Sequence, residues 1–145
     1  MKYLIFACLF LVQIVLGACS KSGPSAATAV IRVSVGSHPP SDAADVVTTA
    51  FTSFSLAQHA EEVLGLAKQW GVSAKEADEK IRAALSVRPG NKPDLFVVEA
   101  SGLDHEAGVR IVNELCTYYG TLHPSVALNG GPAEAIHVTV VQPAK

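Results

Sequence analysis

A dense turn sequence in the middle of the chain constrains the fold most strongly. Residues 89–94 read Pro-Gly-Asn-Lys-Pro-Asp, a run of residue types that favour turns. A short apolar segment precedes this turn at 85–88, and a strongly apolar one follows it at 95–100. Two segments of strand length joined by such a turn predict a β-hairpin. The other elements are therefore expected to be arranged around a central hairpin.

A strand and a helix are predicted near the start of the domain. Residues 29–35 alternate apolar and polar side chains, as in a strand with one buried face. A Gly-Ser-His-Pro-Pro sequence then breaks the strand. The pair Ser41–Asp42 can cap a helix over about 42–52, because both side chains accept hydrogen bonds from backbone N–H groups.

Two further helices are predicted before the hairpin. The first has a capping box at Ser55 and Gln58 and ends at Gly71, since glycine favours the left-handed cap conformation. The second begins with a capping box at Ser73 and Glu76. Each carries one apolar stripe, formed by Ala60, Val63, Leu64, Ala67 and Trp70 in the first helix and by Ala77, Ile81, Ala84 and Leu85 in the second.

One helix and one strand are predicted after the hairpin. Asp104 is placed to cap a helix over 105–119. Residues 120–134 read as irregular, and 136–141 read as the last strand. The inner face of the helix is expected to contain Gly108, Ile111, Val112, Leu115 and Tyr119.

This order of elements predicts an α+β fold. Two right-handed crossovers around a hairpin give the split βαβ, or ferredoxin-like, layout (β-α-α-β-β-α-β), a four-stranded antiparallel sheet with helices on one face. The covered face is expected to contain Ile31, Val33, Phe96, Val98, Val138 and Val140. The opposite face, polar enough to meet water or a partner, is expected to contain Arg32, Ser34, Glu99, His137 and Thr139.

The N-terminal region lies outside this fold. Lys2 supplies a short positive region, and residues 4–16 form an apolar run interrupted only by Gln13. The run is too short to span a bilayer comfortably but suits the core of a signal peptide, which we assign to residues 1–18. Residues 19–28 contain a linker rich in Ser, Gly, Pro and Ala, typical of a flexible tether. The predicted domain therefore spans 29–145.

The signal peptide ends in Leu16-Gly17-Ala18-Cys19, which resembles the lipobox of bacterial lipoproteins. The resemblance implies diacylglyceryl transfer to the Cys19 thiol, cleavage after Ala18 and acylation of the new amino terminus. Several acyl chains on one residue give a stable membrane anchor, whereas one chain binds only marginally. The resemblance thus implies a lipoprotein facing the periplasm, and Ser20 follows the trend for outer-membrane sorting. The alternative is an ordinary secretory signal in which Cys19 has no special role.

The net charge argues against a nucleic-acid partner, and the cysteine content argues against an internal disulfide. The formal net charge is −2, or −3 after loss of Lys2, with no long basic run, so nucleic acid is not expected as a partner. Cys8 leaves with the signal peptide and Cys19 carries lipid, which leaves Cys116 without a disulfide partner. Cys116 lies beside Leu115 in a helical pattern, and we interpret it as a small apolar core residue.

No catalytic, cofactor-binding or metal-binding residue is predicted from the sequence. The sequence has no phosphate-binding glycine loop, nucleophile elbow or paired-cysteine motif. The histidines do not occur at a metal-ligand spacing and are expected at surface or capping positions; they are His38, His59, His105, His123 and His137. The acidic residues of the middle helices are expected on solvated faces; they are Glu61, Glu62, Glu76, Asp78 and Glu79.

Two pairs of side chains are candidates for contact with sugar. Arg88 and Lys92 flank the hairpin turn and could meet an anionic sugar polymer. Tyr118 and Tyr119 could stack on sugar, although a half-buried core position is the simpler interpretation at a helix end.

Residues 85–100 (Leu-Ser-Val-Arg-Pro-Gly-Asn-Lys-Pro-Asp-Leu-Phe-Val-Val-Glu-Ala) and 104–115 (Asp-His-Glu-Ala-Gly-Val-Arg-Ile-Val-Asn-Glu-Leu) carry a family resemblance. They are similar to the N-terminal domain of polysaccharide chain-length determinants, the Wzz-type polysaccharide co-polymerases. That family has a short strand, a turn and an apolar strand before a helix with the trend Asp-Pro-Glu-x-Ala-x-x-Ile-Ala-Asn-x-Leu. His105 replaces the proline and Gly108 replaces the alanine. The matching residues are Asp104, Glu106, Ile111, Asn113 and Leu115.

The resemblance covers roughly residues 29–119, and 136–144 could be the closing strand of the family. Family members assemble as rings in the bacterial inner membrane and set the length of surface polysaccharides without known catalysis. This chain departs from them in three respects. A lipid anchor takes the place of the first membrane helix, about fifteen loop residues replace a long helical hairpin, and the family's second membrane helix does not follow the last strand.

These observations predict a lipid-anchored, non-enzymatic accessory protein of envelope polysaccharide (lipopolysaccharide or exopolysaccharide) biosynthesis or export. It would act through an envelope protein partner or self-association, with polysaccharide itself as a possible ligand. The alternative is a periplasmic binding or structural lipoprotein that shares only the ferredoxin-like fold. A third hypothesis is a small hydrolase that uses His137 or His105 with a nearby carboxylate.

Overall fold

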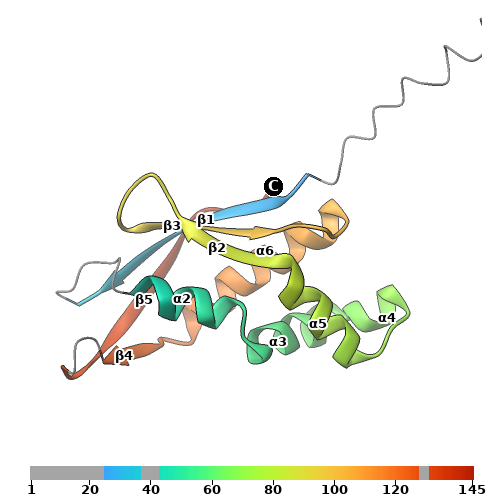
Figure 1. Ribbon diagram of the computed structural model, residues 1–145, viewed down its shortest axis with the longest axis horizontal. Helices are drawn as coiled ribbons and strands as arrows, with labels where there is room; N and C mark the ends of the chain where they lie inside the picture. Colours follow the sequence, from blue (N-terminus) through green and yellow to red (C-terminus); the bar gives the residue numbers. More distant parts are fainter. Residues whose placement is uncertain (1–24, 37–42, 128–130) are drawn as a thin grey trace, which may run out of the picture.

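The computed structural model describes residues 25–36, 43–127 and 131–145. The fold is α+β, with a five-stranded antiparallel sheet that curls into a half-barrel and about five helices (Figure 1). The elements in chain order are β1 (Ala27–Val35), α2 (Ala44–Phe51), α3 (Phe54–Leu64), α4 (Leu66–Trp70), α5 (Ala74–Ala84), β2 (Leu85–Pro89), β3 (Leu95–Ala100), α6 (His105–Thr121), β4 (Ser125–Ala127) and β5 (Ala133–Gln142).

The sheet has the strand order β2-β3-β1-β5-β4, with β1 in the centre. The expected four strands are all present, but a fifth, β4, lies within the stretch that we predicted as irregular. Residues Ser125–Ala127 pair with Ala133–Ala135, which extends β5 beyond its predicted start at residue 136. A strand of three residues shows no alternation of its own, so pairing with a longer neighbour is what defines it.

The buried face of the sheet is the one predicted from alternation. Residue pairs Ile31–Phe96 and Val33–Val138 lie opposite each other across β1, and alternate β1 residues from Ala27 to Val35 are all buried. Helices lie on this side of the sheet, and α6 packs against β1, β3 and β5 (Figure 1). Gly108 permits the close approach of α6, since a Cβ atom there would lie 3.2 Å from the Cβ of Ala27.

Three capping predictions are confirmed. The Asp104 carboxylate accepts a hydrogen bond from the Ala107 N–H (2.9 Å) at the start of α6. Ser73 and Glu76 form a reciprocal capping box at the start of α5. Gly71 ends α4 with φ +65, the left-handed conformation that glycine adopts most easily. The predicted cap at 41–42 lies outside the described residues, and α2 begins at Ala44.

The helix predicted to end at Gly71 is in fact two helices, because Gly65 also takes a left-handed conformation (φ +63) and ends α3. The break changes the helical phase after Gly65, so that Leu66 is fully buried. Val63, which precedes the break and was predicted in the apolar stripe, is 56% exposed. The Ser55–Gln58 capping box is also wrong. The helix begins two residues earlier, and the Ser53 hydroxyl accepts the hydrogen bond from the Leu56 N–H (3.3 Å).

Replacement of Ser53 by alanine is expected to lower the free energy of unfolding by about 1 kcal/mol, because the start of α3 loses its side-chain cap. The matched control is Ser55→Ala, which removes the same hydroxyl from an exposed position inside the helix and should change stability by less than about 0.5 kcal/mol. Chemical denaturation of both variants measures the difference. Equal effects would show that Ser53 is not the cap.

Candidate functional site

The face of the sheet on which none of the described helices lies, here called the open face, is the candidate site. Strand pairing places Val30 beside Val97, which in turn lies beside Arg88 on the edge strand β2. All five residues predicted there lie on it, with Glu99 partly buried and the others exposed. The open face comprises Ser86, Arg88, Leu95, Val97 and Glu99 of β2 and β3, Thr28, Val30, Arg32 and Ser34 of β1, and His137, Thr139, Val141 and Gln142 of β5.

A groove of about 510 Å³ crosses the open face. Its apolar floor comes from Val30, Leu95 and Val97, together with Val141, which is 48% exposed. The register between β1 and β5 shifts at Val30–Ile31, a bulge at the position of Val141. The β2–β3 turn closes one end of the groove, where polar and turn residues complete the lining with Arg88, Pro89, Gly90, Asn91 and Gln142.

Two ion pairs flank the groove. Arg32 Nε lies 2.9 Å from Asp94 Oδ2, and Arg88 Nε lies 3.9 Å from Glu99 Oε2. The arginine side chains are 53% and 60% exposed, so water screens both pairs and each contributes little to stability. Both arginines therefore remain available to a partner. Lys92, the other predicted cation of the turn, is exposed but does not line the groove.

The predicted lipidation site, Cys19, lies outside the described residues, so it stays a prediction. The predicted linker, however, ends earlier than residue 28. Ala27 and Thr28 already belong to β1 and pair with Ala100 and Glu99 of β3. Only seven residues, 20–26, therefore separate Cys19 from the central strand of the sheet. Among the described residues, no helix is long or apolar enough to cross a bilayer.

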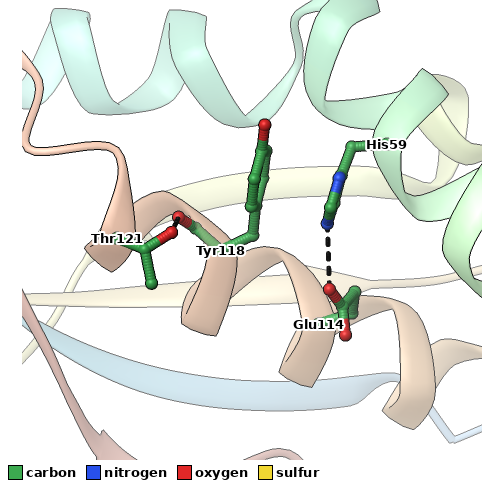
Figure 2. Close-up of polar contacts among 4 residues, drawn as sticks. All are labelled: His59, Glu114, Tyr118 and Thr121. Carbon is green, nitrogen blue, oxygen red and sulfur yellow. Dashed lines mark hydrogen bonds and ion pairs between the residues drawn. The ribbon is translucent and has the colours of Figure 1, made fainter.

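A histidine–carboxylate pair that the sequence did not reveal joins α3 to α6 (Figure 2). His59 Nε2 lies 2.9 Å from Glu114 Oε1, and the imidazole stacks on the Tyr118 ring with 3.4 Å between ring centroids. All three side chains are partly buried. The partners are 55 and 59 positions apart in the chain, so no local motif could have indicated them. None of the three lines the open-face groove.

The other histidines do not assemble a site within the described residues. His105 contacts the hydroxyl and backbone oxygens of Ser25 rather than a carboxylate. His137 and His123 are exposed, and His38 lies outside the described residues. Across 25–36, 43–127 and 131–145, no three histidine, cysteine or acidic side chains are placed to hold a metal ion. Within the described residues, no carboxylate is paired with His105 or His137, the two histidines of the hydrolase hypothesis.

Cys116 and Tyr119 are both core residues. Cys116 is 1% exposed, and burial raises the pKa of its thiol to about 12, so the thiolate is not accessible at neutral pH. Tyr119 is 3% exposed, and burial raises the pKa of its hydroxyl, which has no hydrogen-bond partner among the described residues. Tyr119 packs against Phe51 and is not free to stack on sugar. Tyr118 is already stacked on His59.

Asp78 contradicts the expectation that the acidic residues of the middle helices are solvated. It is 3% exposed, and its Oδ1 atom has no hydrogen-bond partner in the described structure. Burial raises the pKa of Asp78, and the carboxylates of Glu61, Glu62 and Glu79 raise it further. Asp78 follows the buried Ala77 in α5, and α3 packs against this helix. A charged Asp78 therefore destabilises the packing of α3 on α5.

Replacement of His59 by alanine is expected to lower the free energy of unfolding by about 1–2 kcal/mol, through loss of one hydrogen bond and one ring contact. Gln58→Ala is the control, because Gln58 makes only an exposed hydrogen bond to Glu62 on the same helix, worth about 0.2–0.5 kcal/mol. Urea denaturation measures both. A His59→Ala variant as stable as the control would remove the pair's role in joining the helices.

Asp78→Asn is expected to raise the melting temperature at pH 7 by a few degrees. Because the folded-state pKa of Asp78 lies above its ordinary value of 3.8, folding is penalised as pH rises from that value through the folded pKa. The gain from the amide should therefore vanish below about pH 3.8. Melting curves from pH 3 to 7 test this, with the exposed Asp45→Asn as control. A gain that is independent of pH would contradict the assignment.

Comparison with known proteins leaves the site to be interpreted from its geometry. No protein-family model matches the sequence, and no curated protein is significantly similar to it. The feature of the described structure that bears on function is the uncovered, grooved face of the sheet.

Proposed function

We propose that this chain is a lipid-anchored, non-enzymatic accessory protein of envelope polysaccharide assembly or export, which acts through protein contacts made by the open face. The open face carries the proposal. An uncovered apolar groove floor beside two exposed arginines has the composition of a surface that binds a partner. Its position suits such contacts, because β1 follows the predicted anchor closely and contributes to the face itself.

The strand order supports the family relation. Four of the strands follow the order β2-β3-β1-β5, which is that of the split βαβ, or ferredoxin-like, layout, and β4 extends the sheet beyond β5. The chain resembles chain-length determinants in the same segment, from β2 through α6. We therefore propose the ferredoxin-like layout together with descent from a polysaccharide co-polymerase base domain.

The chemistry of the open face supports binding rather than catalysis. Its groove is lined by apolar, amide and turn residues and one arginine, without a nucleophile beside a base. The histidine–carboxylate pair at His59 and Glu114 lies between helices, where its stacking on Tyr118 holds α3 against α6. An arginine beside an apolar floor suits recognition of a protein surface or an anionic polymer.

A second candidate is a periplasmic binding or structural lipoprotein unrelated to polysaccharide. One observation favours it. Chain-length determinants carry a long helical hairpin after the last helix, whereas here α6 is followed by β4 and its hairpin with β5. The partners would then be those of another envelope machine, and the ferredoxin-like fold would be shared without shared function.

Deletion of the gene is expected to alter the chain-length pattern or yield of surface polysaccharide on gels. Complementation with the wild-type protein should restore the pattern, and Cys19→Ser should not, because the anchor is lost. Cys8→Ala is the matched control, since this cysteine lies in the predicted signal peptide and is absent from the mature protein. An unchanged pattern in the deletion strain would refute the polysaccharide role, and pull-down of another envelope machine would then favour the second candidate.

A further inference from the structure

We propose that the open face binds a second copy of this chain, so that two half-barrel sheets pack face to face in a symmetric dimer. The inference deepens the proposed function, on which it rests for the shared membrane anchor, by naming the partner of the same face. Three features of the open face carry it: uncovered apolar side chains, a balanced charge pattern and the short distance to the anchor.

The apolar part of the face is suited to burial in an interface. Val30, Val97 and Val141 form a continuous floor across β1, β3 and β5, and no helix of the described chain covers them. Val141 is 48% exposed. Interfaces bury such apolar surface, and Arg32 and Arg88 lie beside it at neighbouring positions of β1 and β2.

The charge pattern matches a second copy of the same face. In a twofold interface, the same patch faces itself, so a face of one sign would repel its copy. The open face instead has two cations and two anions nearby, in the pairs Arg32–Asp94 and Arg88–Glu99. A rotation of one copy by 180° can place each arginine opposite a carboxylate of the other. The chain as a whole is acidic, so two copies that meet through this balanced face avoid that excess of like charge.

The anchor raises the local concentration of the partner. Seven residues between Cys19 and β1 span at most about 25 Å when fully extended. Every copy is thereby held in a thin layer on one side of one membrane, where a weak interface is populated without added contacts. A twofold axis perpendicular to the membrane lets both tethers reach the bilayer, because the two copies then share the same orientation.

The test uses the mature lipoprotein extracted in detergent, with its mass measured by size-exclusion chromatography and light scattering. Wild type is expected to be a dimer, and Val141→Arg is expected to raise the dissociation constant about tenfold or more, because it buries an unpaired charge in the interface. Val63→Arg is the matched control, since Val63 is an equally exposed valine on α3, away from the sheet. It should leave the dimer intact.

Exchanging the charges of Arg88 and Glu99 tests the dimer by a second route, which does not depend on whether the Val141 variant folds. Arg88→Glu gives the face an excess of negative charge and is expected to weaken the dimer, whereas the double variant Arg88→Glu/Glu99→Arg restores the balance and should restore the dimer. A monomeric wild type, a dimer unaffected by Val141→Arg, or an assembly of the chain with a different protein through this face would each overturn the proposal.

The outcomes also separate this inference from the proposed function. A monomeric wild type in a strain whose polysaccharide pattern depends on the gene would refute the dimer and leave the polysaccharide role standing. A Val141-dependent dimer in a strain with unchanged polysaccharide would establish the dimer and refute that role.

Discussion

The structure depends on the register of β1 between β3 and β5. Every second side chain of β1 from Ala27 to Val35 is buried, and each lies opposite an inner-face residue of a neighbouring strand, as in Ile31–Phe96 and Val33–Val138. A slip of one residue would turn these apolar side chains to water and bring Arg32 into the core, which is why the register has one solution. The same register assembles the open face. The same strand pairings therefore place the core residues on one face of the sheet and the residues of the candidate site on the other.

Alternation in the sequence was enough to predict both faces of the sheet, because a period of two assigns each side chain to one side. Helix caps formed by residues close together in the sequence, such as Asp104 and the Ser73–Glu76 box, were also predicted correctly. The errors arose where a signal was ambiguous or too short. Ser53 and Ser55 both precede apolar residues, and only the packing of Leu56 and Ala57 places the helix start at the former. Strand β4 has too few residues to show a pattern.

Contacts between helices explain the rest of what the sequence could not show. His59 and Glu114 meet only because α3 packs against α6, and Asp78 is buried on α5, against which α3 and α4 pack. The pattern of a single helix predicts that Asp78, which is followed by Glu79, lies on a charged and solvated face. Interhelical packing reverses that assignment without any change in periodicity. Buried polar groups of this kind are therefore visible only once the helices have been assembled.

The family resemblance and the open face support different parts of the functional argument. Asp104 caps α6, Ile111 and Leu115 are buried beneath the sheet, and Asn113 exchanges two hydrogen bonds with the backbone of Ala144, which holds the chain after β5 against α6. Four of the five matching residues thus stabilise the fold. The matching residues therefore belong to the core and its caps, whereas the proposed partner contacts depend on surface side chains. Arg88, Val97 and Val141 are such side chains, and they lie on the face that the helices leave uncovered.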